Sequence, residues 1–177
     1  MGNEKRVHKK RNWKNGAYEI VNSWAVDMLG KFAYTQFPTL NLVQYVKFKG
    51  DAGLTAVEGI NKSGIPVLII HGKEDTVVDY DGPSIISHKE EITNPNVSYF
   101  VTEGEQGGHS SLFWSKETLA YSDEVNQEYE KLYDLYENNP PYEKRVEYID
   151  TLDDALFSEL NKEVFGQIDA FLENALR

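Results

Sequence analysis

The sequence contains no cysteine among its 177 residues. Disulfide bonds, thiolate metal ligands and a cysteine nucleophile are therefore excluded. Such an absence is typical of proteins from a reducing compartment, where disulfides rarely persist. No apolar run reaches the length of a bilayer span, and Met1 is not followed by the basic and then apolar stretch of a secretion signal. We therefore expect a cytoplasmic protein without a membrane span.

Positive charge is also scarce. The chain has 18 lysines and arginines against 29 acidic residues, a net charge of −11, which argues against general nucleic-acid binding. A basic cluster in residues 1–15 is the exception, and because it is short and unrepeated we interpret it as solvated surface rather than an anion site. Eleven tyrosines and eight phenylalanines exclude a disordered composition, and the length suits one domain.

Apolar and aromatic residues recur at helical spacing through residues 16–49. Pro38 interrupts this pattern, so we predict two helices with a kink or turn at residues 36–39. We interpret their large side chains as core or interdomain packing in preference to the lining of an apolar pocket. These side chains include Trp24, Met28, Leu29, Phe32, Leu42, Val43, Tyr45, Val46 and Phe48. A short helix is predicted next, beginning near Leu54 and ending at residues 61–64.

Two strands are predicted in the centre of the chain, at about residues 65–71 and 97–102. The run from Ile65 to Ile70 is apolar without alternation, which is typical of a strand buried on both faces of a parallel sheet. Acidic residues and glycine before Pro83 predict the start of a helix that continues to Ile92. A strand, a helix and a second strand form a βαβ unit, so we expect the strands to be parallel and adjacent.

A glycine-rich loop at residues 103–108 follows the second strand and leads to His109. Helical patterns then cover residues 116–136, 142–149 and 153–176, with a break at the two prolines near residue 140. Because residues 115–150 carry many acids and few large aliphatics, we interpret them as a helical insertion at the surface.

Asp75 and His109 are the strongest candidates for a catalytic pair. Each follows the end of a predicted strand, and ligands and catalytic groups of open α/β sheets gather beyond those ends. Neighbouring strands lie roughly 4.8 Å apart, so the two side chains can meet. A carboxylate that accepts from one ring nitrogen fixes the histidine tautomer and leaves the other nitrogen as a general base.

Other titratable residues near the strands receive structural interpretations. His71 is expected to pack at the strand end, and His88 to face solvent from the connecting helix. The spacing of Asp75, Asp79 and Asp81 does not match a calcium loop, so helix capping and the triad role are favoured. A zinc site made of His71, Asp75 and His109 is disfavoured because its spacing is unusual. We expect no metal and no cofactor.

The segments Ile-Pro-Val-Leu-Ile-Ile-His-Gly-Lys-Glu-Asp-Thr-Val-Val at 65–78 and Gly-Gly-His-Ser-Ser-Leu-Phe-Trp at 107–114 resemble the carboxyl-terminal part of α/β-hydrolases. The resemblance is greatest to the serine aminopeptidase-like and monoacylglycerol-lipase-like branch. It implies that Asp75 is the triad acid and His109 the triad base, with lid helices before the first strand and a final helix at 161–176. The family often has proline where Asp79 stands, which makes Asp79 a competitor for Asp75.

The Gly-x-Ser-x-Gly nucleophile motif of these enzymes is absent, since the surroundings of Ser84 and Ser110 do not match it. The residues before position 64 also leave no room for the early strands or the oxyanion-hole loop. We therefore expect the carboxyl-terminal portion of a serine hydrolase, inactive alone, that cleaves a small ester, thioester, amide or peptide substrate through an acyl-enzyme. The alternative is a non-catalytic half-domain that binds a missing amino-terminal half or dimerises through an exposed strand edge.

The predicted organisation is a single, incomplete α/β-hydrolase domain over residues 1–177. Its parts are lid-like helices at 1–60, the βαβ core at 61–114, the helical insertion at 115–150 and the final helix at 151–177.

Overall fold

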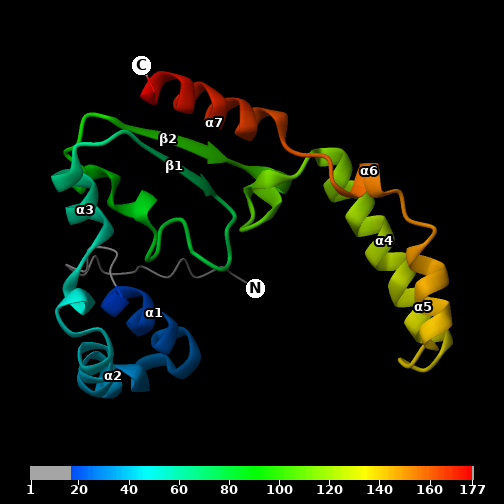
Figure 1. The fold of residues 1–177 in the computed structure, drawn as a ribbon. Coiled ribbons are helices and arrows are strands. Elements are labelled where there is room, and N and C mark those ends of the chain that lie inside the picture. The colour runs from blue at the N-terminus through cyan, green and yellow to red at the C-terminus, as the bar shows by residue number, and fades with distance from the viewer. Residues whose placement is uncertain (1–16, 177) are drawn as a thin grey trace, which may run out of the picture. The chain divides into compact units, whose positions relative to one another are not determined.

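A computed structural model describes residues 17–176 and shows a mixed α/β fold that is mostly helical, with one two-stranded sheet (Figure 1). The strands are β1 (Val67–Gly72) and β2 (Val97–Thr102). The α-helices of the described residues are α1 (Ala17–Leu29), α2 (Ala33–Phe48), α3 (Ala56–Ser63), α4 (Lys116–Leu135), α5 (Tyr142–Ile149), α6 (Asp154–Phe157) and α7 (Lys162–Ala175). Short 3₁₀ helices lie between these elements, namely η1 (Gly30–Phe32), η2 (Lys49–Gly53), η3 (Ile85–Glu91), η4 (Gly104–Gly107) and η5 (Ser111–Phe113). Within residues 17–176, no helix is both long and apolar enough to cross a membrane. The basic cluster noted in the sequence lies outside the described residues.

The two strands pair in parallel. The backbone N–H of Val67 donates to the carbonyl of Asn96 at 3.1 Å, and that of Lys73 donates to the carbonyl of Thr102 at 2.9 Å. The offset along the chain is the same in both pairs, which is the signature of strands that run in one direction. The predicted pair of parallel strands is therefore confirmed.

Burial of the sheet is weaker than its sequence predicts. Ile69 is buried, but Val67, Leu68 and Ile70 are only half-buried, and β2 exposes Tyr99. The prediction of a strand buried on both faces is thus wrong for the half of β1 formed by Val67, Leu68 and Ile70. The reason is that the described sheet has only two strands, so few neighbours cover the side chains along its edges.

The connection between the strands is the 3₁₀ helix η3 (Ile85–Glu91) rather than the expected α-helix. In a 3₁₀ helix, side chains three residues apart lie on the same face, which places His88 on the face of Ile85. His88 is 9% exposed, and its Nδ1 lies 2.9 Å from Oε1 of Glu91. The prediction that His88 faces solvent is therefore wrong.

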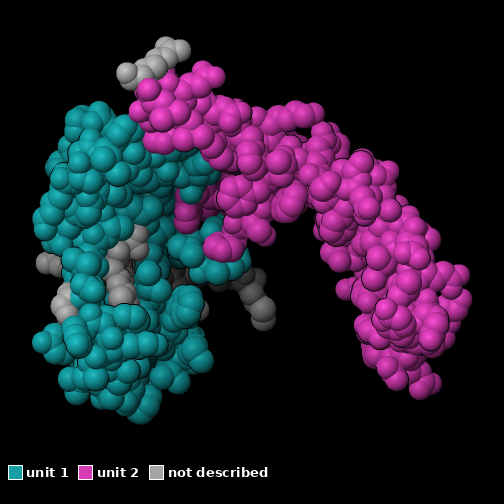
Figure 2. Space-filling view, in the orientation of Figure 1, with its two compact units in different colours: residues 1–70, 75–99 teal, residues 71–74, 100–177 magenta. Residues whose placement is uncertain are grey.

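The described chain divides into two compact units (Figure 2). Unit 1 holds the described residues up to Ile70 together with Asp75–Tyr99. Unit 2 holds His71–Glu74 and the described residues from Phe100 onward. Helices α1–α3 belong to unit 1 and α4–α7 to unit 2, while each strand contributes residues to both.

In unit 1, α1 and α2 form a helical hairpin that turns at Gly30. Gly30 has a φ of +57°, a left-handed conformation that glycine adopts at little steric cost and that commonly ends a helix. Pro38 lies inside α2. The prediction of two helices is confirmed, but the turn predicted at residues 36–39 is wrong, because the turn lies at Gly30 and a proline inside α2 removes only one backbone donor.

The hairpin exposes most of its large apolar side chains, so the predicted core role is wrong for them. Ala33 is fully buried, and among the side chains of the two helices whose burial is described, the others that are buried are the amides of Asn22 and Gln44. The exposed residues are Ile20, Trp24, Met28, Leu29, Phe32, Tyr34, Leu42, Val43, Tyr45, Val46 and Phe48.

In unit 2, the segment that contains α4, α5 and α6 begins and ends at neighbouring positions. Trp114 and Leu160 form an antiparallel bridge. Beside it, the N–H of Asn161 donates to the carbonyl of Phe113 at 2.9 Å. The side chain of Asn161 then accepts from the first backbone N–H groups of α7 and so begins a new helix. The prediction of one continuous helix over residues 153–176 is therefore wrong.

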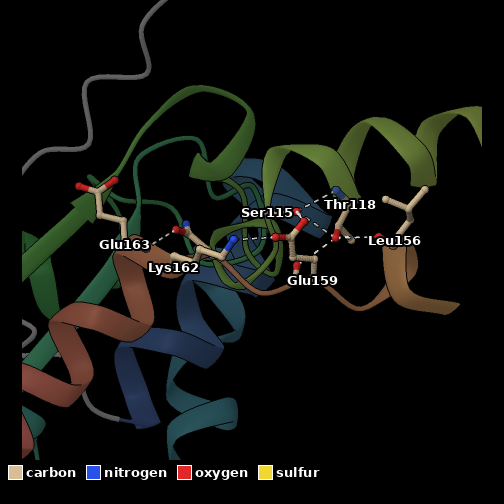
Figure 3. Close-up of polar contacts among 7 residues, drawn as sticks. Ser115, Thr118, Leu156, Glu159, Lys162 and Glu163 are labelled. Carbon is tan, nitrogen blue, oxygen red and sulfur yellow. Dashed lines mark hydrogen bonds and ion pairs between the residues drawn. The ribbon is translucent and has the colours of Figure 1, made fainter. Parts of the chain in front are cut away.

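A cluster of polar contacts, the α4–α7 clasp, holds this junction together (Figure 3). Ser115 Oγ accepts from the N–H of Thr118 at 3.0 Å, and the Thr118 hydroxyl lies 2.9 Å from the carbonyl oxygens of both Leu156 and Glu159. Lys162 Nζ donates to Glu159 Oε1 at 2.9 Å. This contact lowers the pKa of Glu159 and raises the pKa of Lys162. Within the clasp, the side chain of Ser115 caps the first turn of α4.

Candidate functional site

Asp75 caps the turn that follows β1. Its Oδ1 accepts hydrogen bonds from the backbone N–H groups of Val77 and Val78, both at 2.8 Å, and the residue is only 7% exposed. An aspartate side chain that accepts hydrogen bonds from the backbone N–H groups two and three residues further along the chain stabilises a turn of this kind. Because a carboxylate has two oxygens, Oδ1 can hold the turn while Oδ2 serves another group.

Asp79 has a similar local role in a more exposed place. Its Oδ1 accepts from the N–H of Asp81 at 3.1 Å, and its carbonyl accepts from the N–H of Gly82 at 2.9 Å. Asp79 is exposed, whereas Asp75 is buried. The two candidate acids therefore differ in solvation more than in hydrogen bonding.

His109 lies in the loop that follows β2, after the 3₁₀ helix η4 (Gly104–Gly107), and its side chain is exposed. Hydrogen bonds close the loop on both sides of it. The N–H of Gly108 donates to Ser111 Oγ at 2.9 Å, and Gln106 Nε2 donates to the carbonyl of Trp114 at 2.7 Å. The backbone that presents His109 is therefore fixed by its own neighbours.

The end of β1 is bonded to the loop that carries His109. The N–H of Glu74 donates to the carbonyl of Gly107 at 2.9 Å, and Glu74 Oε2 accepts from the N–H of Gly104 at 3.0 Å. Lys73 Nζ also pairs with Glu103 Oε1 at 2.7 Å. These contacts attach the residues just before Asp75 to the residues just before His109.

Gly72 lets the two segments approach closely. A Cβ at this position would lie 2.6 Å from the carbonyl carbon of Gly107 and 2.9 Å from the carbonyl oxygen of Gly108, which is closer than real Cβ contacts allow. Sequence reasoning missed both Gly72 and Glu74. The sequence did contain a signal for Gly72: this glycine ends the first predicted strand, and the pair Gly107-Gly108 follows the second. Glycines in such positions indicate that two backbone segments approach each other closely.

The remaining candidates have structural positions. His71 is buried within β1, as expected for a histidine that packs at the strand end. Among residues 17–176, no group of three histidine, aspartate or glutamate side chains is placed to hold a metal ion. Asp75 belongs to unit 1 and His109 to unit 2, so each side chain is described within its own unit.

A scan against protein-family models, a search of curated proteins and a search of solved structures found no match to this chain.

Proposed function

We propose that this chain supplies the acid and the base of a Ser-His-Asp triad in a serine hydrolase of the α/β-hydrolase type. In this proposal, Asp75 accepts from one ring nitrogen of His109, and the other nitrogen takes the proton of a serine that attacks an ester, thioester or amide. The serine and the oxyanion hole belong to polypeptide outside these 177 residues. Helices α1–α3 act as lid-like elements over an acyl or peptide pocket, and α7 is the final helix of the fold. The absence of cysteine supports a cytoplasmic location.

One observation carries the proposal, namely the attachment of Glu74 to the loop between Gly104 and Gly107. Asp75 follows Glu74 directly, and His109 follows Gly107 by two residues. A bonded frame at the carboxyl ends of two parallel strands is the setting in which α/β enzymes gather their catalytic groups. The frame therefore supports a functional pairing of the two side chains.

Burial supports Asp75 over Asp79 as the acid. A carboxylate shielded from water orients a histidine more strongly than an exposed one, because water screens their interaction less. The capping bonds to Val77 and Val78 also fix the carboxylate of Asp75 in one orientation. A rigid acid of this kind is what preorganised catalysis requires.

The surroundings of the serines near this frame support an external nucleophile. Ser84 is buried, and its hydroxyl donates to the carbonyl of Tyr80 at 2.9 Å, so it is committed to the fold. Ser110 follows His109 directly, outside any Gly-x-Ser-x-Gly elbow. A base without a nucleophile and an oxyanion hole contributes little, so the chain alone is expected to be inactive.

The test is the tautomer of His109 in the intact chain, read from ¹⁵N spectra of the imidazole ring. In the wild type we expect a single tautomer with the proton on the nitrogen that faces Asp75. Asp75→Asn keeps an oxygen for the turn but presents an amide N–H to the ring, so the tautomer should change. Asp79→Asn is the matched control and should leave the spectrum of His109 unchanged.

A response of His109 to Asp79→Asn, with none to Asp75→Asn, makes Asp79 the acid. A response to neither substitution overturns the triad assignment.

A second candidate function is a non-catalytic module that associates through its sheet. The described sheet has two strands, so β1 has an outer edge that β2 does not cover. Unpaired strand edges are templates for pairing with another chain. This function predicts self-association that depends on the β1 edge and not on Asp75 or His109.

A further inference from the structure

Glu74 bonds to both ends of the 3₁₀ helix η4. Its backbone N–H donates to the carbonyl of Gly107, the last residue of η4, at 2.9 Å. Its side-chain Oε2 accepts from the N–H of Gly104, the first residue of η4, at 3.0 Å. In the described chain, Glu103, which precedes η4, makes no side-chain capping bond to it. The cap of η4 is therefore supplied by a residue thirty positions earlier in the sequence.

Gly107 is matched to the carboxylate of Glu74. A Cβ at Gly107 would collide with Oε2 of Glu74 and would lie 2.9 Å from its carboxyl carbon. The φ of Gly107 is not positive, so the backbone conformation does not itself require glycine here. What requires glycine is the space that the carboxylate takes on its way to Gly104. A side chain at position 107 would therefore break the bond that caps η4.

The position of η4 is passed on to His109 by a short segment. Gly108 alone stands between η4 and His109, and its N–H donates to Ser111 Oγ at 2.9 Å. Glu74 and this whole segment belong to unit 2, so their contacts lie within one compact body. A 3₁₀ helix of four residues has poor hydrogen-bond geometry of its own and depends on such external contacts.

We propose that Glu74 is a positioning residue for His109. It holds η4 at both ends and so fixes the backbone from which the imidazole extends. The catalytic value of this role rests on the hydrolase function proposed above, since a misplacement of about 1 Å in a catalytic constellation can cost about a hundredfold in rate.

A second contact joins the same two segments but does not take this role. Lys73 pairs with Glu103, and their side chains are 51% and 63% exposed. Exposed ion pairs contribute little, because water screens the charges and two long side chains must be ordered. This pair is therefore a suitable control for the contact of Glu74.

The experiment compares Glu74→Gln with Glu74→Asp in the full chain. Glutamine keeps an oxygen at the same reach and loses the charge, whereas aspartate keeps the charge and is one methylene shorter. The readout is NMR relaxation of the His109 backbone N–H, whose order parameter should be about 0.85 in the wild type and in Glu74→Gln. In Glu74→Asp it should fall to about 0.6 or below, and the N–H of Gly104 should exchange roughly tenfold faster with water.

Glu103→Asp is the matched control, since it shortens the carboxylate of the exposed ion pair by the same methylene. It should leave the order parameter of His109 unchanged. Glu74 and Glu103 are both exposed, and the backbone bond from Glu74 to Gly107 does not need a side chain. All three variants should therefore unfold at the urea concentration of the wild type, which makes the readout local to the loop.

Gly107→Ala tests the same contact from its other partner. In the wild-type chain the added methyl group should displace the carboxylate and speed exchange at Gly104 by the same roughly tenfold. In a chain that already carries Glu74→Ala there is no carboxylate to displace. Gly107→Ala should then change this rate by less than about twofold, because two residues in contact do not act additively.

Four results would overturn the proposal. The first is an order parameter of His109 that no substitution of Glu74 changes, and the second is a loss in Glu74→Gln but not in Glu74→Asp, which makes the effect one of charge. The third is an equal loss in Glu103→Asp, and the fourth is an equal effect of Gly107→Ala with and without the Glu74 carboxylate. The hydrolase function fails separately, through the tautomer of His109, and that failure leaves the order parameters as expected here.

Discussion

At the scale of single residues, Gly72 is the position near the candidate site where an added side-chain atom would fit least well. It stands where the end of β1 meets Gly107 and Gly108, and a methyl group there would meet backbone atoms rather than a flexible side chain. The backbone of one segment would have to move to make room. That movement would strain the hydrogen bonds by which Glu74 holds the loop of His109.

Gly72→Ala is therefore expected to destabilise the protein by about 1–3 kcal/mol, the usual cost of overpacking, measured by urea denaturation. Gly59→Ala is the matched control. Gly59 lies in α3, where an added Cβ would have no atom within 4 Å, and alanine favours helix, so this change should stabilise by up to about 1 kcal/mol. Equal effects of the two substitutions would show that the close approach at Gly72 is unimportant.

At the scale of secondary-structure elements, α7 depends on the residue before it. Asn161 is buried, and its Oδ1 accepts from the N–H groups of Glu163 and Val164 at 3.1 and 3.3 Å. Its Nδ2 donates to the carbonyl of Leu112 at 2.9 Å. One side chain thus begins the helix and also binds it to the segment that follows the loop of His109.

Asn161→Ala should cost roughly 2–3 kcal/mol, since it removes a helix cap and leaves the carbonyl of Leu112 unpaired in a buried place. Asp153→Ala removes the equivalent cap from the four-residue helix α6 at an exposed position, so its cost should be smaller. Urea denaturation compares the two, and hydrogen exchange should show faster opening of α7 only in the first variant. A smaller loss for Asn161→Ala than for Asp153→Ala would contradict the role given to Asn161.

Elements with strong local signals were predictable from the sequence. The apolar, β-branched run before His71 predicted β1, and the prolines near residue 140 predicted the break before α5. The helix boundaries that were predicted wrongly depend on backbone conformations and capping bonds, which the spacing of apolar residues does not indicate. Gly30 rather than Pro38 turns the hairpin, and the cap at Asn161 divides the last helix. The exposure of α1 and α2 was missed because helical spacing indicates a face but not what covers it.

The candidate site was predictable to a similar degree. Strand order alone placed Asp75 and His109 after neighbouring parallel strands, and the parallel pairing is confirmed. The burial that separates Asp75 from Asp79, and the contacts of Glu74 with the loop, required the three-dimensional fold. They involve residues about thirty positions apart, and no local pattern reports such pairs.

At the scale of the whole molecule, the sheet is small: the described residues form one sheet of two strands, β1 and β2. A sheet of two strands is marginal on its own, and parallel sheets are normally covered and extended by neighbours. Val67 donates its N–H to Asn96, the residue just before β2. Because successive N–H groups of a strand point to opposite sides, the N–H of Leu68 points to the outer edge.

Association through this edge should therefore respond to proline. Leu68→Pro removes only an outward donor, so it should reduce self-association in sedimentation velocity while the fold is retained. Val67→Pro is the control at an adjacent, equally half-buried position, and it should destabilise by about 1 kcal/mol or more because a strand-pairing bond is lost. Unchanged association in Leu68→Pro would exclude the edge as the contact.

The bridge between Trp114 and Leu160 has a consequence for how this chain can vary. The chain enters and leaves the α4–α6 segment at adjacent points, so that segment behaves as a cassette. Its length can change between Thr118 and Leu156, two residues of the clasp, without altering the spacing between the His109 loop and α7. The turn near Asn138, at the far end of the cassette, is then the natural place to graft a reporter or a second domain, since such sites tolerate insertion best.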